Sequence, residues 1–244
     1  MKKKIAFFDF TCCEGCQVEL TNLGADKFAG LLNLVEFVEF REVMSEKTGE
    51  TIDISFIEGS FSREKDRERL IKIRERSKIV VAYGSCATLG GINALKHRKE
   101  GWKEFVYGDA NFEILNSSKA LPISSVIKVD YCLHGCPINR EEFLKMAIDL
   151  VMDKEPLIPN YPVCVQCKVN ETVCRYLLNE CCLGLVARAG CGAPCPKDGI
   201  PCEACRGFVD NPNLEALKEV IKDKKLQEKL YLFTSNQMEE KDEQ

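Results

Sequence analysis

Residues 78–87 read KIVVAYGSCA, a mostly apolar run that ends in glycine, serine, cysteine and alanine. A continuous apolar run of this length predicts a central strand of a parallel sheet, because such strands are buried on both faces. Cys86 lies just beyond the strand. Parallel strands end at one common edge of the sheet, and folds of this type bind their ligands there. The stretch therefore predicts a parallel sheet with a thiol at its carboxyl edge.

Further strands and helices alternate on either side of this stretch. Apolar runs predict strands at residues 4–10, 34–41, 52–58 and 126–131. Helical patterns occupy residues 17–32, 62–77 and 140–152, with Ser62 as a candidate N-cap of the second helix. The alternation predicts an α/β protein with a mostly parallel, doubly wound sheet.

Four cysteines of the first half follow predicted strands: Cys13, Cys16, Cys86 and Cys136. One such cysteine alone is more often a buried structural residue than a ligand. All four stand at strand ends, however, and three have a glycine beside or close to them. We therefore expect the four thiols to converge at the carboxyl edge of the sheet.

The later part of the chain is dense in cysteine. Residues 153–163 hold three prolines and predict a linker. The 42 residues after it contain nine cysteines: Cys164, Cys167, Cys174, Cys181, Cys182, Cys191, Cys195, Cys202 and Cys205. This region shows little periodicity and little core, so bound metal would have to supply its folding energy. We expect two domains, residues 1–153 and residues 154–244, with a short helix beginning near Asn213 in the second.

Composition excludes several classes of function. The net charge of −4 and the lack of a basic stripe argue against a nucleic-acid partner. The apolar runs are only a few residues long, too short to span a bilayer, so we expect no direct membrane insertion. Lys2 to Lys4 resemble the basic start of a signal peptide. The apolar run after them is too short for one, because Asp9 ends it after four residues. We expect a cytoplasmic protein, and a reducing compartment disfavours stable disulfides, so fifteen cysteines predict metal ligands.

Catalytic motifs are lacking. The chain has neither a phosphate-binding loop nor a dinucleotide fingerprint after a strand. Of the two histidines, His97 lies in a charged stretch and is expected to be solvated, while His134 is a neighbour of Cys136. We therefore expect no catalytic residue on this chain.

Structural zinc and iron–sulfur clusters are the two main uses for these cysteines, and spacing alone separates them poorly. Three observations favour clusters. One set is assembled from separate strand-end loops, the Cys-Pro pairs at 136–137 and 195–196 echo ferredoxin motifs, and twelve cysteines divide into three fours. The zinc alternative would make the protein an interaction module without a redox role.

The chain resembles the small, electron-transferring subunit of nickel–iron hydrogenases, of the soluble cytosolic type found with sulfhydrogenases or cofactor-reducing partners. The resemblance covers nearly the whole chain. It is carried by Cys13-Glu14-Gly15-Cys16, Phe56-Ile57-Glu58-Gly59-Ser60, Gly84-Ser85-Cys86-Ala87, Gly135-Cys136-Pro137 and the run from Tyr161 to Gly207.

The resemblance implies three 4Fe–4S clusters and a flavodoxin-like first domain. The first set (Cys13, Cys16, Cys86 and Cys136) would hold the proximal cluster. The second set (Cys164, Cys167, Cys174 and Cys182) would hold the distal cluster. The third set (Cys191, Cys195, Cys202 and Cys205) would hold the medial cluster. Electrons would pass between a large subunit, whose nickel–iron site splits hydrogen, and a flavin- or cluster-bearing acceptor subunit.

Two positions depart from the periplasmic branch of that family, which has histidine where Cys164 stands and proline where Cys195 stands. The resemblance thus implies three clusters held by cysteine alone. Cys12, Cys132 and Cys181 are left over, and Cys12 could exchange with Cys13, or Cys181 with Cys182. A related cluster subunit of the quinone-reducing respiratory complex I is an alternative, but it lacks the cysteine-rich run.

Overall fold

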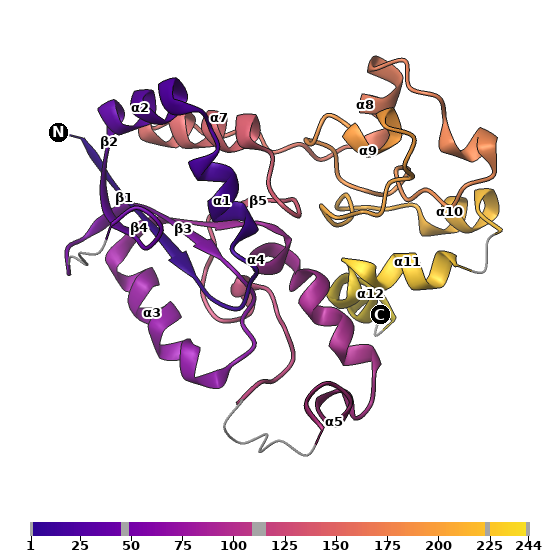
Figure 1. The fold of residues 1–244 in the computed structure, drawn as a ribbon, viewed down its shortest axis with the longest axis horizontal. Helices are drawn as coiled ribbons and strands as arrows, with labels where there is room; N and C mark the ends of the chain where they lie inside the picture. Colours follow the sequence, from indigo (N-terminus) through magenta and orange to yellow (C-terminus); the bar gives the residue numbers. More distant parts are fainter. Residues whose placement is uncertain (1, 45–48, 109–115, 223–224, 243–244) are drawn as a thin grey trace.

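The computed structural model describes residues 2–44, 49–108, 116–222 and 225–242. Its centre is a five-stranded, fully parallel sheet in the order β2-β1-β3-β4-β5 (Figure 1). The strands are β1 (Lys3–Asp9), β2 (Val35–Phe40), β3 (Ile52–Glu58), β4 (Ser77–Tyr83) and β5 (Tyr131–Leu133). The predicted α/β class with a parallel sheet is confirmed.

Helices cover both faces of the sheet. On one face lie α1 (Gly15–Thr21), α2 (Ala25–Leu34) and α7 (Arg140–Val151). On the other lie the 3-10 turn η1 (Glu64–Asp66) and α3 (Arg67–Arg76) (Figure 1). Successive residues of β1 pack on opposite faces of the sheet. Phe7 packs in the same cluster as Phe143 of α7, and Phe8 packs in the same cluster as Leu70 of α3. This period of two is what a doubly covered strand requires.

Two predicted helices differ in detail. The single helix expected over 17–32 is two helices, because the chain turns at Gly24, whose φ of +90° ends one helix and starts the next. Ser62 does not cap α3. Its hydroxyl donates to Thr11 Oγ1 at 2.8 Å, and a 3-10 turn leads into the helix instead.

The strand expected over 126–131 is much shorter and begins only at Tyr131. A 3-10 turn at Ile123–Ser125 is followed by Val126 in a helical conformation, and Asp130 determines where the pairing with β4 begins. Its side-chain carboxylate accepts the N–H of Val80 at 2.9 Å, where a strand neighbour would have offered a backbone carbonyl. The pairing with β4 therefore starts only at Val81 and Tyr131.

Short helical elements follow β4 and link it to β5. They are α4 (Ser85–Leu89), η2 (Gly91–Arg98), α5 (Trp102–Tyr107) and η3 (Ile123–Ser125). His97 on η2 is not solvated as expected. Its side chain is 2% exposed, and its Nε2 accepts the backbone N–H of Ala120 at 2.6 Å.

The cysteine-rich part consists of short helices joined by loops. They are α8 (Val163–Val169), η4 (Arg175–Leu178), α9 (Pro194–Lys197), α10 (Leu214–Val220), α11 (Leu226–Leu232) and α12 (Ser235–Asp242). Contrary to expectation, this part has a core of its own. Leu183, Val186, Phe208, Leu217 and Leu230 are almost fully buried in one cluster. The sequence pattern missed it because these apolar residues come from loops and from separate short helices.

Helix α12 returns to the first half of the chain. Asn236 of α12 is buried and its Nδ2 donates to Leu89 O at 2.8 Å and to Ala120 O at 3.0 Å. Gln237 accepts the N–H of Phe208 at 3.0 Å. The helix thus ties α4, the loop before η3 and the cysteine-rich part together.

In the described part of the chain, no helix has both the length and the apolar character needed to cross a membrane.

Candidate functional site

The first set of cysteines lies at the carboxyl edge of the sheet. Cys16 sits in the first turn of α1, just after β1; Cys86 sits in the first turn of α4, just after β4; and Cys136 follows β5. Burial and, to a smaller extent, the nearby thiols of Cys136, Cys12 and Cys13 raise the pKa of the Cys86 thiol to about 12. The structure therefore brings together the thiols that the sequence predicted to converge.

Gly84 gives Cys16 its room. A Cβ on Gly84 would stand 2.6 Å from the sulfur of Cys16, and the backbone φ of Gly84 is +82°. A side chain at this position would collide with the thiol and strain the turn that leads into α4. The glycine before Ser85 and Cys86 is therefore part of the site.

Glu58 is a site residue to which the sequence assigned no role. It ends β3, is 2% exposed, and accepts the backbone N–H of Cys16 at 3.1 Å and that of Gln17 at 3.2 Å. Burial raises the pKa of this carboxyl group, and the hydrogen bonds from Cys16 and Gln17 oppose that rise. The sequence feature that could have identified Glu58 is a carboxylate at the end of an apolar strand, directly before Gly59. Glu58 fixes the first turn of α1 and with it the direction of Cys16.

Two further polar side chains are buried without partners near this edge. Both amide atoms of Gln17 and the hydroxyl of Tyr83 make no hydrogen bond within the described part of the chain, and both residues are 0% exposed. Burial raises the pKa of Tyr83 well above its usual value, and the charges of Glu58 and Cys16 add to the effect.

The second set surrounds one cavity. Cys164, Cys167, Cys174 and Cys182 all line a space of about 260 Å³ between α8 and η4. Gly184 forms part of its wall, and a Cβ there would stand 3.4 Å from the sulfur of Cys164 and 3.5 Å from that of Cys182. Burial raises the pKa of Cys164 to about 11, and the thiols of Cys182, Cys167 and Cys174 reinforce it.

Cys181 points elsewhere. It lines a separate pocket of about 360 Å³ with Tyr176, Val220 and Ile221, on the side of α10. Of the two adjacent cysteines, the structure therefore places Cys182, and not Cys181, with the rest of the second set.

The third set surrounds a smaller cavity of about 30 Å³. Cys191, Cys195, Cys202 and Cys205 line it together with Pro194 and other residues. Cys202 is nearly fully buried, which raises its pKa well above the usual value. Burial raises the pKa of Cys205 to about 11, while a hydrogen bond from the backbone N–H of Cys136 opposes the rise.

The third set lies between the other two. Ser85, next to Cys86 of the first set, donates its hydroxyl to the carbonyl of Cys205, and the N–H of Cys202 donates to the sulfur of Cys182 of the second set at 3.2 Å. In space, the order is first, third, second.

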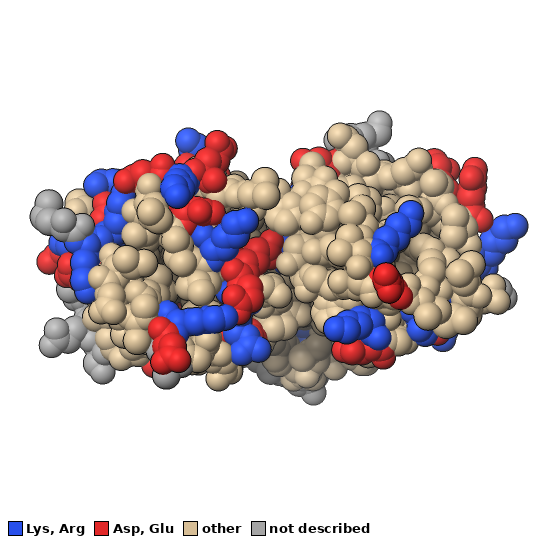
Figure 2. Space-filling model, turned by 90° about the horizontal axis from the view of Figure 1, so that it is seen from above, with Lys and Arg blue, Asp and Glu red and all other residues tan. Residues whose placement is uncertain are grey.

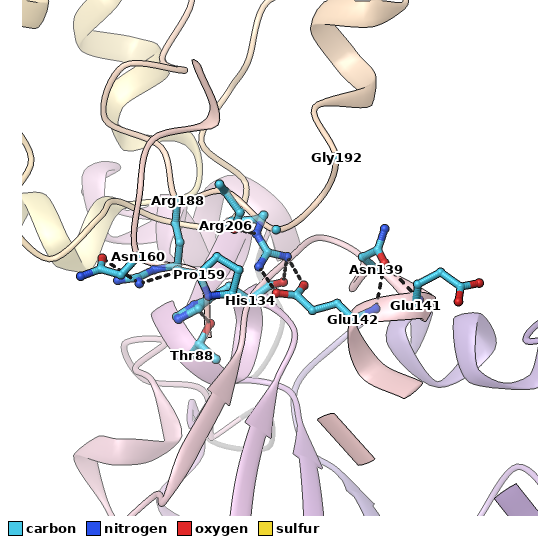
Figure 3. A network of polar contacts seen from close by, with 12 residues as sticks. Thr88, His134, Asn139, Glu141, Glu142, Pro159, Asn160, Arg188, Gly192 and Arg206 are labelled. Carbon is cyan, nitrogen blue, oxygen red and sulfur yellow. Dashed lines mark hydrogen bonds and ion pairs between the residues drawn. The ribbon is translucent and has the colours of Figure 1, made fainter. Parts of the chain in front are cut away.

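A buried ion pair joins the first and third sets. Arg206, directly after Cys205, binds the carboxylate of Glu142 on α7 and donates to the carbonyls of His134 and Ala189 (Figure 3). Gly190 makes room for the pair, because a Cβ there would collide with the Arg206 guanidinium. Burial and, to a smaller extent, the charges of Arg188 and Arg206 lower the pKa of His134 to about 3, so the imidazole is neutral.

Arg188 is a second buried arginine near this junction. It donates to Pro159 O and Asn160 Oδ1, each at 3.0 Å, and to Asp210 Oδ1 at 2.6 Å (Figure 3). Pro159 and Asn160 come just before α8, and Asp210 belongs to the cysteine-rich part, so Arg188 braces that part internally.

The remaining cysteines are Cys12, Cys132 and Cys181. Burial raises the pKa of Cys12 to about 12, and its sulfur donates to Phe10 O at 3.6 Å. Cys132 is in β5 and also has a raised pKa, because it is buried. No disulfide joins any of the fifteen cysteines, each of which lies in the described part of the chain.

The donor set fits iron–sulfur groups. Cysteine thiolates in fours are the usual ligands of 4Fe–4S clusters. The second and third sets each enclose a cavity lined by all four of their thiols. In the first set, any side chain at position 84 would collide with the sulfur of Cys16, so the glycine keeps space for that thiol. Within the described ranges, no three Cys, His, Asp or Glu side chains meet at the spacing of a single metal ion.

Comparisons with known proteins agree with this chemistry. Residues 13–150 match the family described as "NADH ubiquinone oxidoreductase, 20 Kd subunit". The chain is 37% identical over 238 residues to sulfhydrogenase 2 subunit delta of Pyrococcus furiosus, covering 94% of this chain and 98% of that protein. It is 27% identical to the iron-sulfur subunit of the F420-non-reducing hydrogenase of Archaeoglobus profundus, covering 86% of this chain and 83% of that one.

A solved structure shares the fold. The chain superimposes on a chain of an NAD+-reducing [NiFe]-hydrogenase in its H2-reduced state with a TM-score of 0.57 and 26% identity. The match covers 65% of this chain and 96% of that one.

Proposed function

We propose that this chain, which belongs to the NADH ubiquinone oxidoreductase 20 kDa subunit family, is the electron-transferring small subunit of a nickel–iron hydrogenase. The observation that carries the proposal is the arrangement of twelve cysteines in three sets of four, with the third set in contact with both the first and the second. Redox centres that pass electrons from one to the next need this serial order, whereas structural metal sites do not.

The first set would hold the proximal 4Fe–4S cluster, the third set the medial cluster and the second set the distal cluster. Such clusters supply the ability to take up and release single electrons. This chain's own residues provide the rest: thiolates as ligands, glycines where the backbone must approach sulfur, and Glu58 to orient Cys16. Cys182, and not Cys181, would be the fourth ligand of the second set, because of the two only Cys182 lines its cavity. Cys13, and not Cys12, would be the ligand in the first set. The chain would divide into two domains after residue 153.

The hydrogen-splitting site would lie on a large subunit that contacts the first set at the edge of the sheet. The carboxyl edge of the parallel strands presents exposed thiols, among them Cys13 and Cys136, to such a partner. No set of thiols remains on this chain for a nickel site once the twelve are assigned. The chain would therefore be inactive alone.

An acceptor subunit would dock on the second set. The surface around that cavity is apolar: Val169, Val173 and Leu177 are 78%, 63% and 79% exposed. Figure 2 shows fewer charged side chains over the cysteine-rich half than over the sheet half of the face it views. Exposed apolar side chains that gather at one place mark interaction sites, and here they surround the redox group that must hand over its electron. We infer that the acceptor, flavin- or cluster-bearing, covers this surface, and that the complex works in the reducing cytoplasm.

The family name by itself also suggests a quinone-reducing complex. The family match ends at residue 150, whereas the similarity to the hydrogenase relative from Pyrococcus furiosus extends over 94% of the chain. The cysteine-rich part thus goes with the hydrogenase subunits. This favours hydrogen over quinone as the substrate of the complex.

Metal and sulfide analysis of anaerobically purified protein tests the proposal. Three 4Fe–4S clusters require about twelve irons per chain and equal sulfide, with negligible zinc. Hydrogen should bleach the brown colour when the large subunit is present, and leave it unchanged when that subunit is absent. About three zincs and no sulfide would contradict the proposal and favour structural metal sites.

A further inference from the structure

The first and third cysteine sets meet at one closely bonded place. The Gly135-Cys136 segment is held by Ser85, whose backbone N–H donates to Gly135 O at 2.7 Å. The hydroxyl of the same Ser85 donates to the carbonyl of Cys205. Ser85 therefore holds a segment of each set, and it is itself the residue before Cys86.

A second bridge closes the same junction. Arg206 follows Cys205, and its Nη1 donates to the carbonyl of His134, two residues before Cys136. Glu142 fixes the guanidinium through two contacts of 2.7 and 2.8 Å. Ser85 and Arg206 thus clamp Cys205 against the loop of Cys136, and both side chains are almost fully buried.

We propose that Cys136 and Cys205 form the electronic contact between the first and third cysteine sets, and that Ser85 and Arg206 are the positioning residues that hold this contact. Two hydrogen bonds to one residue join the two cysteine segments: the N–H of Ser85 donates to Gly135 O, next to Cys136, and its hydroxyl donates to Cys205 O. The connection between the two segments therefore runs through a single buried residue. This inference rests on the proposed function, because it assigns a coupling role to thiolates that carry redox groups.

The contact between the third and second sets is made by other residues. The backbone N–H of Cys202 donates directly to the sulfur of Cys182 at 3.2 Å, and Gln166 Oε1 accepts the N–H groups of Gly190 and Gly192 at 3.1 and 3.2 Å. Neither Ser85 nor Arg206 takes part in these hydrogen bonds. Ser85 and Arg206 are therefore the residues through which substitution should alter coupling most selectively.

Electron paramagnetic resonance of the intact complex, purified anaerobically and reduced with dithionite, tests the inference. Two neighbouring paramagnetic clusters split and broaden each other's spectra. Ser85→Ala should keep full iron and sulfide content but lose the part of the splitting that arises between the first and third sets. Ser85→Thr, which keeps the hydroxyl, should retain it. Arg206→Lys keeps the charge but not the forked contacts, and should also lose the splitting.

Arg188→Met is the matched control. Arg188 is buried like Arg206 and belongs to the same part of the chain, but its hydrogen bonds go to Pro159, Asn160 and Asp210 and not to the Cys136 loop. It should keep the splitting. Wild-type splitting in both Ser85→Ala and Arg206→Lys, or equal loss in Arg188→Met, would overturn the inference while leaving the proposed function intact. A wild-type protein without iron and sulfide would instead overturn the proposed function.

Discussion

The guanidinium of Arg206 and the carboxylate of Glu142 face each other in a two-pronged ion pair, with nitrogen–oxygen distances of 2.7 and 2.8 Å. The two side chains expose only 3% and 13% of their surface. One belongs to the cysteine-rich part and the other to α7, on the sheet. The pair therefore fastens two parts of the chain that lie 64 residues apart in sequence.

Removal of one partner should be costly. Arg206→Met or Glu142→Gln leaves a buried group without its partner, which typically costs about 3–5 kcal/mol of unfolding free energy. The double variant Arg206→Met/Glu142→Gln removes both charges and should cost clearly less than the sum. Denaturant unfolding of the wild type and the three variants measures this. Strictly additive losses would show that the two groups do not stabilise each other.

Asp130 gives a prediction of pH dependence. Burial raises the pKa of its carboxyl group, but the N–H of Val80 and the Arg74 guanidinium outweigh burial, and the net pKa lies below the usual value. A depressed native pKa contributes stability above the unfolded pKa of about 4, and that stability is lost as the pH falls through the native pKa. Asp130→Asn should therefore cost about 1–3 kcal/mol at pH 7.

The same variant should differ less from the wild type below about pH 4, where the aspartic acid in the unfolded chain is protonated. Thermal or denaturant unfolding from about pH 3 to about pH 8 measures the difference. A loss of stability that stays constant over this whole range would show that the hydrogen bonds of Asp130, and not its charge, are responsible.

The adjacent cysteines Cys181 and Cys182 should behave differently. Cys182 lines the cavity of the second set, whereas Cys181 faces α10. Cys182→Ser should therefore lower the iron content from about twelve to about eight atoms per chain. Cys181→Ser should leave it unchanged. The reverse result would exchange the two ligands.

Tyr83 should tolerate loss of its hydroxyl. The side chain is 0% exposed and its hydroxyl has no hydrogen-bond partner among the described residues. A buried polar group without a partner costs about 1–3 kcal/mol. Tyr83→Phe should therefore leave the unfolding free energy unchanged or raise it. A loss of more than about 1 kcal/mol would indicate that a buried water serves this hydroxyl.

Much of the fold was predictable because its signals are local. The apolar runs of β1, β3 and β4 each predict a strand with nearly its observed bounds, and cysteines that follow strands must meet at one edge of a parallel sheet. The break at Gly24 was missed because the apolar pattern continues across it. The shortened β5 depends on Asp130, whose side chain replaces a backbone acceptor, and no periodicity reveals that.

The rest of the site depends on contacts between distant residues. Glu58 ends a strand 42 residues after Cys16, and only the folded sheet places its carboxylate on the N–H of Cys16. The core of the cysteine-rich part is drawn from loops such as that of Leu183 and from helices such as α11, so no single stretch shows a periodic pattern. His97 is surrounded by charges in sequence, yet α12 and the loop of Ala120 cover it.

The bonds that Asn236 makes to Leu89 and Ala120 also constrain how the protein is made. Synthesis runs from the amino end, so the strands and the first four-cysteine edge leave the ribosome long before residue 236 does. The carbonyls of Leu89 and Ala120 receive their buried donor only when α12 arrives. Until then, the end of helix α4, which carries Cys86, lacks the hydrogen bond from Asn236. The first cysteine set therefore gains its full structural support only after the residues of the other two sets have been made.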